Sequence, residues 1–290
     1  MFGNTTTLAR SWELTKMSFR VIRDDKEILL FPLLAGLCSI VFFVSLLFPT
    51  LIVEVIKTTN LSKVVGPFEG ALIALTYFGI SFFTTFFNVC AANTAKVRFG
   101  GGNATFLDSF RFALSQLSLI IAWSVFNATV GMVFKFLDSS AERFGGMGRF
   151  FFRIFYTFLG FAWNVVSLFV VPAMVYENIG PFSAIQRSAQ TIKQTWGESL
   201  VKHYGFTFVF ACFFNGGLVV LAIGLVLSFQ SGPVALVSVS ALAGLYFLAL
   251  ILLFSCANTI YSVALYAYAN QHPIPDAVDK DLLAFAFASH

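Results

Sequence analysis

Residues 204–229 read YGFTFVFACFFNGGLVVLAIGLVLSF and contain no charged side chain. About 20 predominantly apolar residues are enough for an α-helix to cross the hydrocarbon core of a bilayer. A helix is the form to expect, because lipid offers no partner for unpaired backbone N–H and C=O groups. The stretch therefore predicts a transmembrane helix and decides the fold class of the chain.

Five further apolar runs reach a similar length. They lie at about 28–53, 70–95, 116–137, 152–176 and 235–266. The last of them is long enough to tilt in the bilayer or to project beyond it. We therefore expect an all-α integral membrane protein with six transmembrane helices, in which residues 1–290 form a single membrane domain.

The composition agrees with this class. Hydrophobic residues make up 58% of the 290 residues and charged residues only 11%, whereas soluble domains carry about 25% charged residues. So few charges cannot cover a soluble protein of this length, and most of the surface is expected to face lipid. This excludes a cytosolic enzyme, a nucleic-acid-binding protein and a disordered tail.

The distribution of basic residues predicts the orientation. If the N-terminus is cytoplasmic, twelve of the 18 Lys and Arg residues fall on that side and six on the other. Cytoplasmic loops carry the excess of Lys and Arg, so both termini are expected in the cytoplasm. Arg143 and Arg149 run against this assignment, because they fall on the outer side. The polar start of the chain does not resemble a signal peptide, so the first apolar run is expected to stay as a membrane anchor.

Three polar segments, 7–23, 105–117 and 183–196, repeat apolar residues at helical spacing. Each predicts an amphipathic helix on the cytoplasmic side. Thr105 with Asp108 predicts a capping box, and Ser183 predicts an N-cap. The basic side chains expected to face lipid headgroups or partner proteins are Arg10, Lys16, Arg20, Arg111, Arg187 and Lys193.

The three amphipathic segments also resemble one another in sequence. Arg10-Ser11 matches Arg187-Ser188, and Ser11 matches Ser109 at a second offset. The spans that close each unit end on Asn93, Asn178 and Asn270, which we expect to be helix C-caps.

We interpret this pattern as a pseudo-threefold parallel repeat of about 5–95, 103–178 and 181–270, followed by a cytoplasmic C-terminal tail at 271–290. Each unit is a cytoplasmic amphipathic helix followed by a transmembrane hairpin, so the six spans form three hairpins. The alternative is that amphipathic connectors between spans share this pattern without any duplication.

Four short motifs near the two ends of the chain carry a family resemblance. They are RSWELTK at 10–16, with EILLFP at 27–32, and LYAYA at 265–269 before HPIP at 272–275. They resemble the DUF6159 family of uncharacterised prokaryotic membrane proteins over nearly the whole chain. AIQRS at 184–188, with Lys193, is similar to the membrane domain of glycerophosphodiester phosphodiesterases. The resemblance implies a multi-pass fold in the plasma (inner) membrane of a prokaryote, and it implies no activity.

No catalytic or metal-binding constellation appears in the sequence. Nucleotide loops of the Walker type, HExxH and GxSxG are absent. Cys38, Cys90, Cys212 and Cys256 stand alone in apolar runs, which favours buried thiols over a metal site or a disulfide framework. We expect no enzyme activity, no cofactor and no metal ion.

Glycine clusters and carboxylates offer weaker signals. Gly100–Gly102 favours a helix break over an anion site at the next helix, and Gly145–Gly148 favours a loop. Glu177 lies at the end of the fourth span. A salt bridge to Arg187 or Lys193 is one interpretation of Glu177, and a proton or cation site is the other.

Five of the six spans carry an asparagine near the middle, which either hydrogen-bonds a neighbouring helix or lines a polar path. The candidates for such a lining are Asn88, Asn127, Asn164, Asn215 and Asn258, with Glu177.

From these patterns we expect a non-enzymatic scaffold or accessory subunit that contacts lipid or partner proteins through its cytoplasmic amphipathic helices. Membrane lipids, a second copy of the chain or another membrane protein are the expected partners, and nucleic acid is not. The alternative is a transporter or channel for a small or lipid-like solute with an Asn-lined path.

Overall fold

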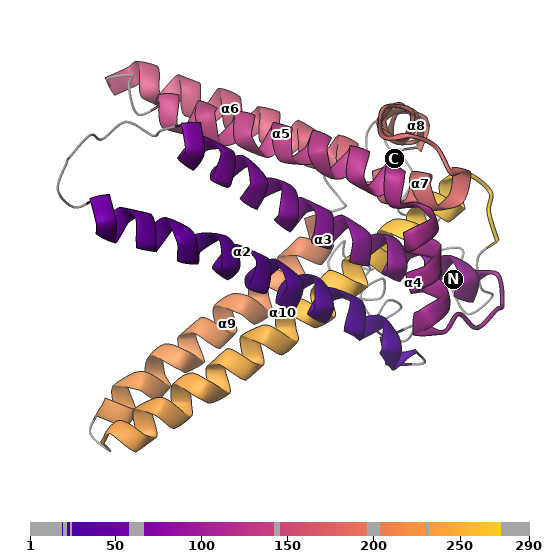
Figure 1. Ribbon diagram of the computed structural model, residues 1–290. Helices are drawn as coiled ribbons and strands as arrows, with labels where there is room; N and C mark the ends of the chain where they lie inside the picture. The colour runs from indigo at the N-terminus through magenta and orange to yellow at the C-terminus, as the bar shows by residue number, and fades with distance from the viewer. Residues whose placement is uncertain are drawn as a thin grey trace. The chain divides into compact units, whose positions relative to one another are not determined.

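The computed structural model describes residues 19, 22–23, 25–57, 67–141, 146–195, 204–229 and 232–273. Within these residues all regular structure is helical, which confirms the all-α fold class (Figure 1). Six helices among them are long and apolar enough to cross a membrane: Lys26–Leu46, Gly70–Phe99, Leu117–Ser140, Met147–Glu177, Val209–Phe229 and Pro233–Ala269. The number of candidate spans is therefore the number predicted from hydropathy.

The chain packs as two compact units. The central unit contains residues 31–96 and 103–190, and the terminal unit contains residues 1–30, 97–102 and 191–290. Most of segment 7–23, including Arg10, Lys16 and Arg20, lies outside the described residues, as does the tail beyond residue 273.

The central unit contains most of seven helices. They are α2 (Leu30–Lys57), α3 (Pro67–Phe99), α4 (Phe106–Ser115), α5 (Leu117–Ala141), α6 (Gly146–Ser167), α7 (Val170–Glu177) and α8 (Pro181–Thr195). Helix α2 packs closely on α3, where the rings of Phe42 and Phe83 lie 5.7 Å apart between centroids. Gly79 permits this approach, because a Cβ atom there would overlap the Phe42 ring.

Aromatic stacking also joins α5 to α6 and α4 to α2. Trp123 of α5 stacks on Trp163 of α6 at 5.9 Å between ring centroids. Phe106 of α4 stacks on Phe31 of α2 at 5.1 Å. Aromatic pairs of this geometry contribute about 0.5–1.5 kcal/mol beyond the area that they bury. Part of the high phenylalanine content therefore serves to pack helices against one another.

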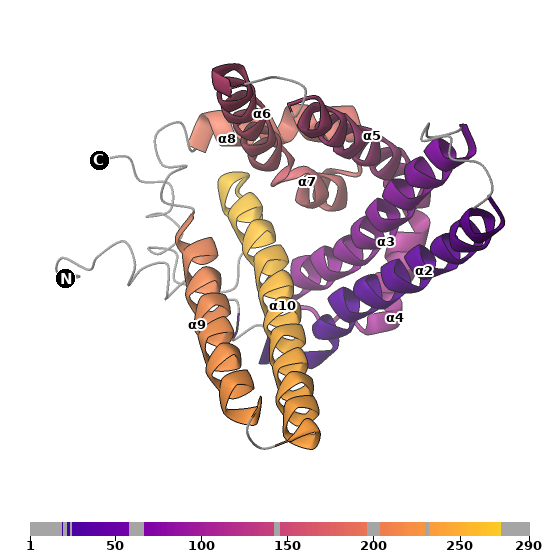
Figure 2. The ribbon, with the colours of Figure 1, turned by 90° about the vertical axis from the view of Figure 1, so that its left-hand side faces the viewer.

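The terminal unit contains the short helix η1 (Lys26–Leu29) and two long helices, α9 (Tyr204–Phe229) and α10 (Pro233–Ala269). Figure 2 shows α9 and α10 side by side. At 1.5 Å per residue, the 37 residues of α10 extend about 55 Å, well beyond a hydrocarbon core of about 30 Å. Its buried residues begin at Leu250 and run to Ala267, so burial is concentrated in its C-terminal half.

The apolar run at 152–176 predicted one continuous helix for the fourth span. The structure instead divides this span into two helices. Helix α6 ends at Ser167 and α7 begins at Val170. Pro172 explains the break, because proline lacks the N–H that would bond the carbonyl of Leu168 and its ring crowds that carbonyl. Proline is tolerated in the first turn of α7, where no N–H is needed.

Of the four helix caps predicted at Ser183 and at Asn93, Asn178 and Asn270, two are confirmed and two are wrong. Asn178 is a C-cap in the left-handed conformation with φ 54°, and Asn270 is the C-cap of α10. Asn93 is not a cap, because α3 continues to Phe99. Ser183 lies inside α8, which begins at Pro181.

The glycine cluster after α3 is the predicted helix break. Gly101 is left-handed at φ 79°, and the amides of Gly101 and Gly102 donate to the carbonyls of Arg98 and Val97 at 3.0 and 2.9 Å. This pair of hydrogen bonds is the Schellman motif, which satisfies carbonyls left without a partner at a helix end.

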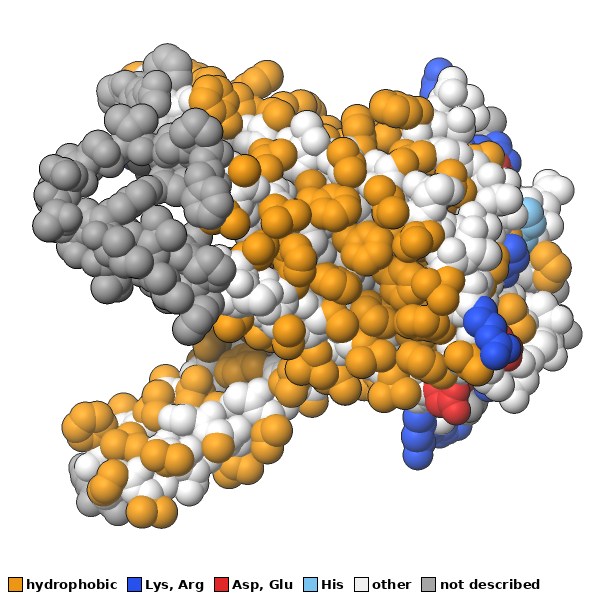
Figure 3. Space-filling model, in the orientation of Figure 1, with side chains coloured by type: hydrophobic (Ala, Val, Ile, Leu, Met, Phe, Trp, Pro, Cys, Tyr) orange, Lys and Arg blue, Asp and Glu red, His pale blue; other side chains and the backbone are white. Residues whose placement is uncertain are grey.

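The exposed surface is largely apolar. On the face drawn in Figure 3, hydrophobic side chains cover most of the surface of the long helices. Phe158 of α6 and Val220 of α9, for example, are 68% and 71% exposed. Contiguous apolar surface of this kind marks contact with a membrane or with other proteins, as expected for membrane-spanning helices.

Candidate functional site

Polar side chains of the central unit form hydrogen bonds between the C-terminal parts of α3 and α7 and the helices α4 and α8. We call this group the polar end. It consists of Asn93, Thr94, Lys96, Ser109, Glu177, Arg187 and Ser188.

Ser109 fixes α4 to α3. Its side chain is fully buried, and its Oγ accepts a hydrogen bond from Asn93 Nδ2 at 3.2 Å. Its hydroxyl also shares a hydrogen bond with Thr94 Oγ1 at 2.7 Å, and Thr94 Oγ1 donates to the carbonyl of Cys90 at 3.2 Å. A buried polar group is costly unless it is partnered, so this chain of bonds sets the position of α4.

Ser188 fixes α8 at the break of the fourth span. Its Oγ donates to the carbonyl of Val166 at 2.6 Å and accepts from the amide of Phe169 at 3.3 Å. In a continuous helix these two backbone groups would bond Val170 and Val165 instead. A single hydroxyl from α8 therefore replaces two helical hydrogen bonds that the break removes.

Lys96 of α3 caps the far end of α7. Its Nζ donates to the carbonyl of Val175 at 2.9 Å and lies 5.0 Å from the centroid of the Tyr176 ring. The last four carbonyls of a helix have no partner within the helix, and the helix dipole favours a cation there. Lys96 satisfies both conditions, although the sequence reasoning had not singled it out.

Glu177 and Arg187 form the expected ion pair. Arg187 Nε donates to Glu177 Oε1 at 2.7 Å, and the two side chains remain 34% and 26% exposed. The pair joins the last residue of α7 to the middle of α8. The salt-bridge interpretation of Glu177 is thus confirmed with Arg187 as its partner.

The start of α4 contains the predicted capping box. Asp108 accepts from the Thr105 amide at 3.1 Å and from the Thr105 hydroxyl at 2.6 Å, and its own amide donates to Thr105 Oγ1 at 3.3 Å. The hydrogen bonds from the Thr105 side chain and backbone lower the pKa of the Asp108 carboxyl. Both bonds favour the ionised form, which fixes where the helix begins.

Arg111 and Lys193 lie on exposed faces. Arg111 follows the buried Ser109 by two residues on α4, which is about 200° around the helix. Lys193 follows the buried Ser188 by five residues on α8, which is about 140° around the helix. In each helix the serine faces the protein and the basic side chain faces outward.

The five asparagines are divided between the two units. Asn88, Asn127 and Asn164 belong to the central unit, and Asn215 and Asn258 belong to the terminal unit. Asn127 donates to Ser81 of α3 at 3.2 Å, which is a contact between helices. Asn215 donates to the carbonyl of Ala211 in its own helix at 2.7 Å.

Exposure differs within this set. Asn164, Asn215 and Asn258 are exposed, whereas Asn88 and Asn127 are half-buried. Helix-to-helix bonding thus accounts for Asn127.

The terminal unit contains an ion pair around a buried carboxylate, which no sequence pattern predicted. Asp25 is 6% exposed, and its Oδ2 accepts from Arg98 Nε at 3.0 Å. Burying a carboxylate is costly unless a cation and hydrogen bonds compensate it. The two residues are 73 positions apart, so no local pattern in the sequence links them.

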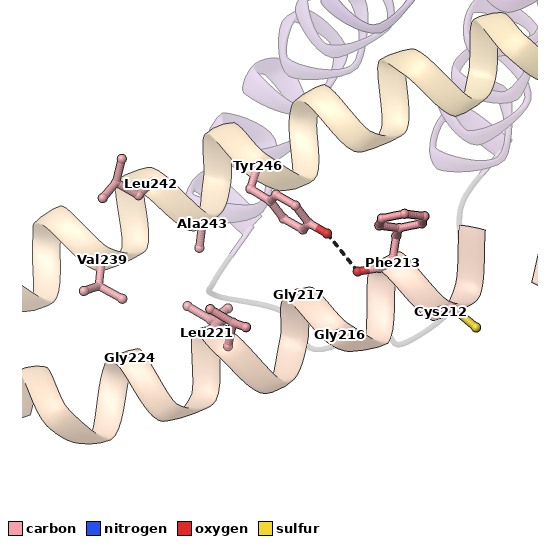
Figure 4. A pocket seen from close by; sticks show the side chains of 11 residues that line it. Cys212, Phe213, Gly216, Gly217, Leu221, Gly224, Val239, Leu242, Ala243 and Tyr246 are labelled. Carbon is pink, nitrogen blue, oxygen red and sulfur yellow. Dashed lines mark hydrogen bonds between the residues drawn. The ribbon is translucent and has the colours of Figure 1, made fainter. Parts of the chain in front are cut away.

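An apolar groove of about 610 Å³ runs between α9 and α10. Gly216, Gly217 and Gly224 line it from α9, and Val239 and Tyr246 line it from α10 (Figure 4). The Tyr246 hydroxyl donates to the carbonyl of Phe213 at 2.9 Å across the groove. The lining of the groove is almost entirely apolar and includes no charged side chain, so the groove fits an apolar ligand or a lipid chain.

The polar groups in the described part of the chain support the structure by satisfying backbone hydrogen bonds. No group of three or more His, Cys, Asp or Glu side chains within the described ranges could hold a metal ion. The polar end instead partners backbone groups at a broken span and at helix ends. Such an arrangement can position α4 and α8 against the helices that they contact.

Comparisons with known proteins give one match. The model of a family of unknown function, DUF6159, matches residues 69–274, which is more than half of the chain. LYAYA at 265–269 lies inside the match, whereas the motifs at 10–16 and 27–32 lie outside it, so the resemblance covers less of the chain than expected. No curated protein and no solved structure matches the chain. The chain belongs to the DUF6159 family.

Proposed function

We propose that the protein is a non-enzymatic, multi-pass membrane scaffold or accessory subunit whose surface helices bind anionic lipid or partner proteins. The observation that carries this proposal is the opposite placement of serine and basic residues on α4 and α8. Ser109 and Ser188 are fully buried against the spans, while Arg111 and Lys193 are exposed. Such helices present positive charge at the membrane surface without leaving the span bundle.

The same observation supports the repeat. Ser109 and Ser188 occupy matching positions in the proposed repeats, and each hydrogen-bonds the span that precedes it. In our proposal the three units are hairpins that follow amphipathic helices, with all three helices on the cytoplasmic side. Both termini then lie in the cytoplasm, and the protein resides in the inner membrane of a prokaryote. The likeness of 184–188 to the phosphodiesterase membrane domain belongs to the same proposal.

Lipid titration of the full-length protein in neutral detergent tests the lipid-binding part. Phosphatidylglycerol should raise the unfolding temperature more than phosphatidylcholine does, because a ligand of the native state stabilises it. Each neutralised cation should weaken binding about fivefold, from about 1 kcal/mol per basic residue near an anionic surface. Arg111→Gln and Lys193→Gln should therefore reduce the effect, and high salt should suppress it.

Lys135→Gln is the matched control, since Lys135 is also exposed but belongs to α5 and not to α4 or α8. Equal stabilisation by the two lipids, or an equal loss in all three variants, would contradict binding through α4 and α8.

A transporter or channel is the second candidate, and the broken fourth span favours it. Interrupted helices at membrane depth occur where backbone groups are buried in protein or line a water-filled cavity. Single cysteines at 127 and 164, in a variant without the four native cysteines, test this candidate. Labelling of both by a membrane-impermeant maleimide would support an aqueous path, and protection of both would oppose it.

A further inference from the structure

Helix α7 is a short segment held on both of its ends. At its start, Ser188 of α8 bonds the carbonyl of Val166 and the amide of Phe169 on either side of the break. At its last residue, Glu177 pairs with Arg187 of the same helix α8. Two adjacent residues of α8 therefore hold both ends of α7.

The junction between α6 and α7 has fewer helical hydrogen bonds than a continuous helix would have. Pro172 removes one helical hydrogen bond, and the amide of Leu168 turns to the carbonyl of Val165 at 3.1 Å. Breaks of this kind are the places where helices bend. Because Ser188 of α8 bonds a backbone group on each side of the break, a shift of α8 removes hydrogen bonds that close the junction.

Arg187 connects this junction to the membrane surface. Its side chain is 34% exposed although it is paired with Glu177. Guanidinium groups bind phosphate as readily as carboxylate, often through two parallel hydrogen bonds. An anionic lipid phosphate can therefore compete with Glu177 for Arg187 and weaken the contact between α8 and the end of α7.

We propose that residues 168–169 are a hinge, latched by Ser188 and Arg187, which opens when α8 binds an anionic lipid headgroup. This rests on the proposed function, because it takes α8 to lie at the membrane surface. The ligand class is the phosphate monoanion of an acidic phospholipid. Lipid binding at α8 thereby changes the conformation of the fourth span.

Hydrogen–deuterium exchange of the full-length protein in lipid nanodiscs tests the hinge. The nanodiscs contain phosphatidylcholine alone or an equal mixture with phosphatidylglycerol. Exchange is read over two peptides, one across the break at 164–171 and one along α8 at 181–193. For the wild type, phosphatidylglycerol should speed exchange across the break and slow it along α8.

Two variants identify the latch. In phosphatidylcholine alone, Ser188→Ala should speed exchange across the break about tenfold, which corresponds to about 1.4 kcal/mol and matches the loss of one or two hydrogen bonds. Arg187→Gln should also open the break without any anionic lipid. Ser183→Ala is the matched control, because Ser183 is an exposed serine of the same helix, and it should behave as the wild type.

The outcomes separate the two proposals. If phosphatidylglycerol protects α8 but leaves the break unchanged or slower, the hinge is wrong and lipid binding stands. If it changes neither peptide, lipid binding by α8 fails, and the hinge fails with it. Should Ser188→Ala not fold, the wild-type comparison between the two lipid mixtures still decides the question.

Discussion

Replacing Ser109 by alanine removes the hydroxyl that joins α4 to α3. Ser109 is fully buried and Asn93 is only 7% exposed, so water cannot readily take the place of the lost group. The substitution deletes the 3.2 Å bond from Asn93 Nδ2 and the 2.7 Å bond with Thr94 Oγ1. Ser109→Ala leaves the Asn93 amide without the Ser109 oxygen that accepts its hydrogen bond.

The expected loss of stability follows from these contacts. A hydrogen bond makes a net contribution of about 0.5–1.5 kcal/mol to stability, and a buried donor left without an acceptor costs about 1–3 kcal/mol. Hydrogen bonds between membrane helices average less, about 0.6 kcal/mol. We therefore expect Ser109→Ala to destabilise the protein by about 2 kcal/mol, which lowers the unfolding temperature by about 4–8 °C for a domain of this size.

Thermal unfolding in detergent, followed by tryptophan fluorescence, measures this effect, because the Trp123–Trp163 stack lies in the same unit. Ser115→Ala is the control, since Ser115 is exposed and bonds only the Phe112 carbonyl of its own helix at 2.6 Å. Asn93→Ala completes a double-mutant cycle, with an expected coupling of at least about 0.5 kcal/mol. Unfolding of Ser109→Ala within about one degree of the control, or a cycle without coupling, would show that Ser109 does not hold α4 to α3.

Three further predictions concern other parts of the molecule. Gly217→Ala should separate α9 from α10 at a cost of about 1–3 kcal/mol, because its Cβ would overlap the Tyr246 ring; unfolding measurements should show this loss, which Gly216→Ala should not share. Arg98→Ala should cost about 1–3 kcal/mol by leaving the buried Asp25 carboxylate without its half-exposed cation, and thermal stability unchanged from the wild type would contradict this. Asp108→Asn should destabilise at neutral pH but match the wild type in strong acid. The lowered pKa of Asp108 means that its contribution is present above the ordinary value of 3.8 and is lost as pH falls through the lowered value; a constant difference in unfolding temperature at all pH values would count against it.

Hydropathy predicted the spans because lipid imposes one condition on every residue along a helix. Residues 204–229 need no partner to be recognised, and α9 has those bounds in the structure. The capping box at Thr105 and Asp108 was equally local, since its two members are one helical turn apart. The pattern could therefore be read without knowing what the helix packs against.

Asn93 shows where local patterns fail. Its place before a glycine-bearing stretch predicts a helix cap, yet α3 continues six residues further and Asn93 turns to Ser109 of another helix. The identity of that partner depends on how α4 folds back on α3. A similar limit applies to the break at 168–169, where Pro172 was a visible signal but the role of Ser188 was not.

The length and apolarity of each run are local properties, so they suffice to predict an all-helical protein with six candidate membrane spans. Which polar groups meet depends on the tertiary structure. Ser188 bonds backbone groups about twenty residues earlier, and Arg98 bonds Asp25 across 73 positions. Hydrogen bonds and ion pairs act over about 3 Å, so only the folded path of the chain determines which residues come within their reach.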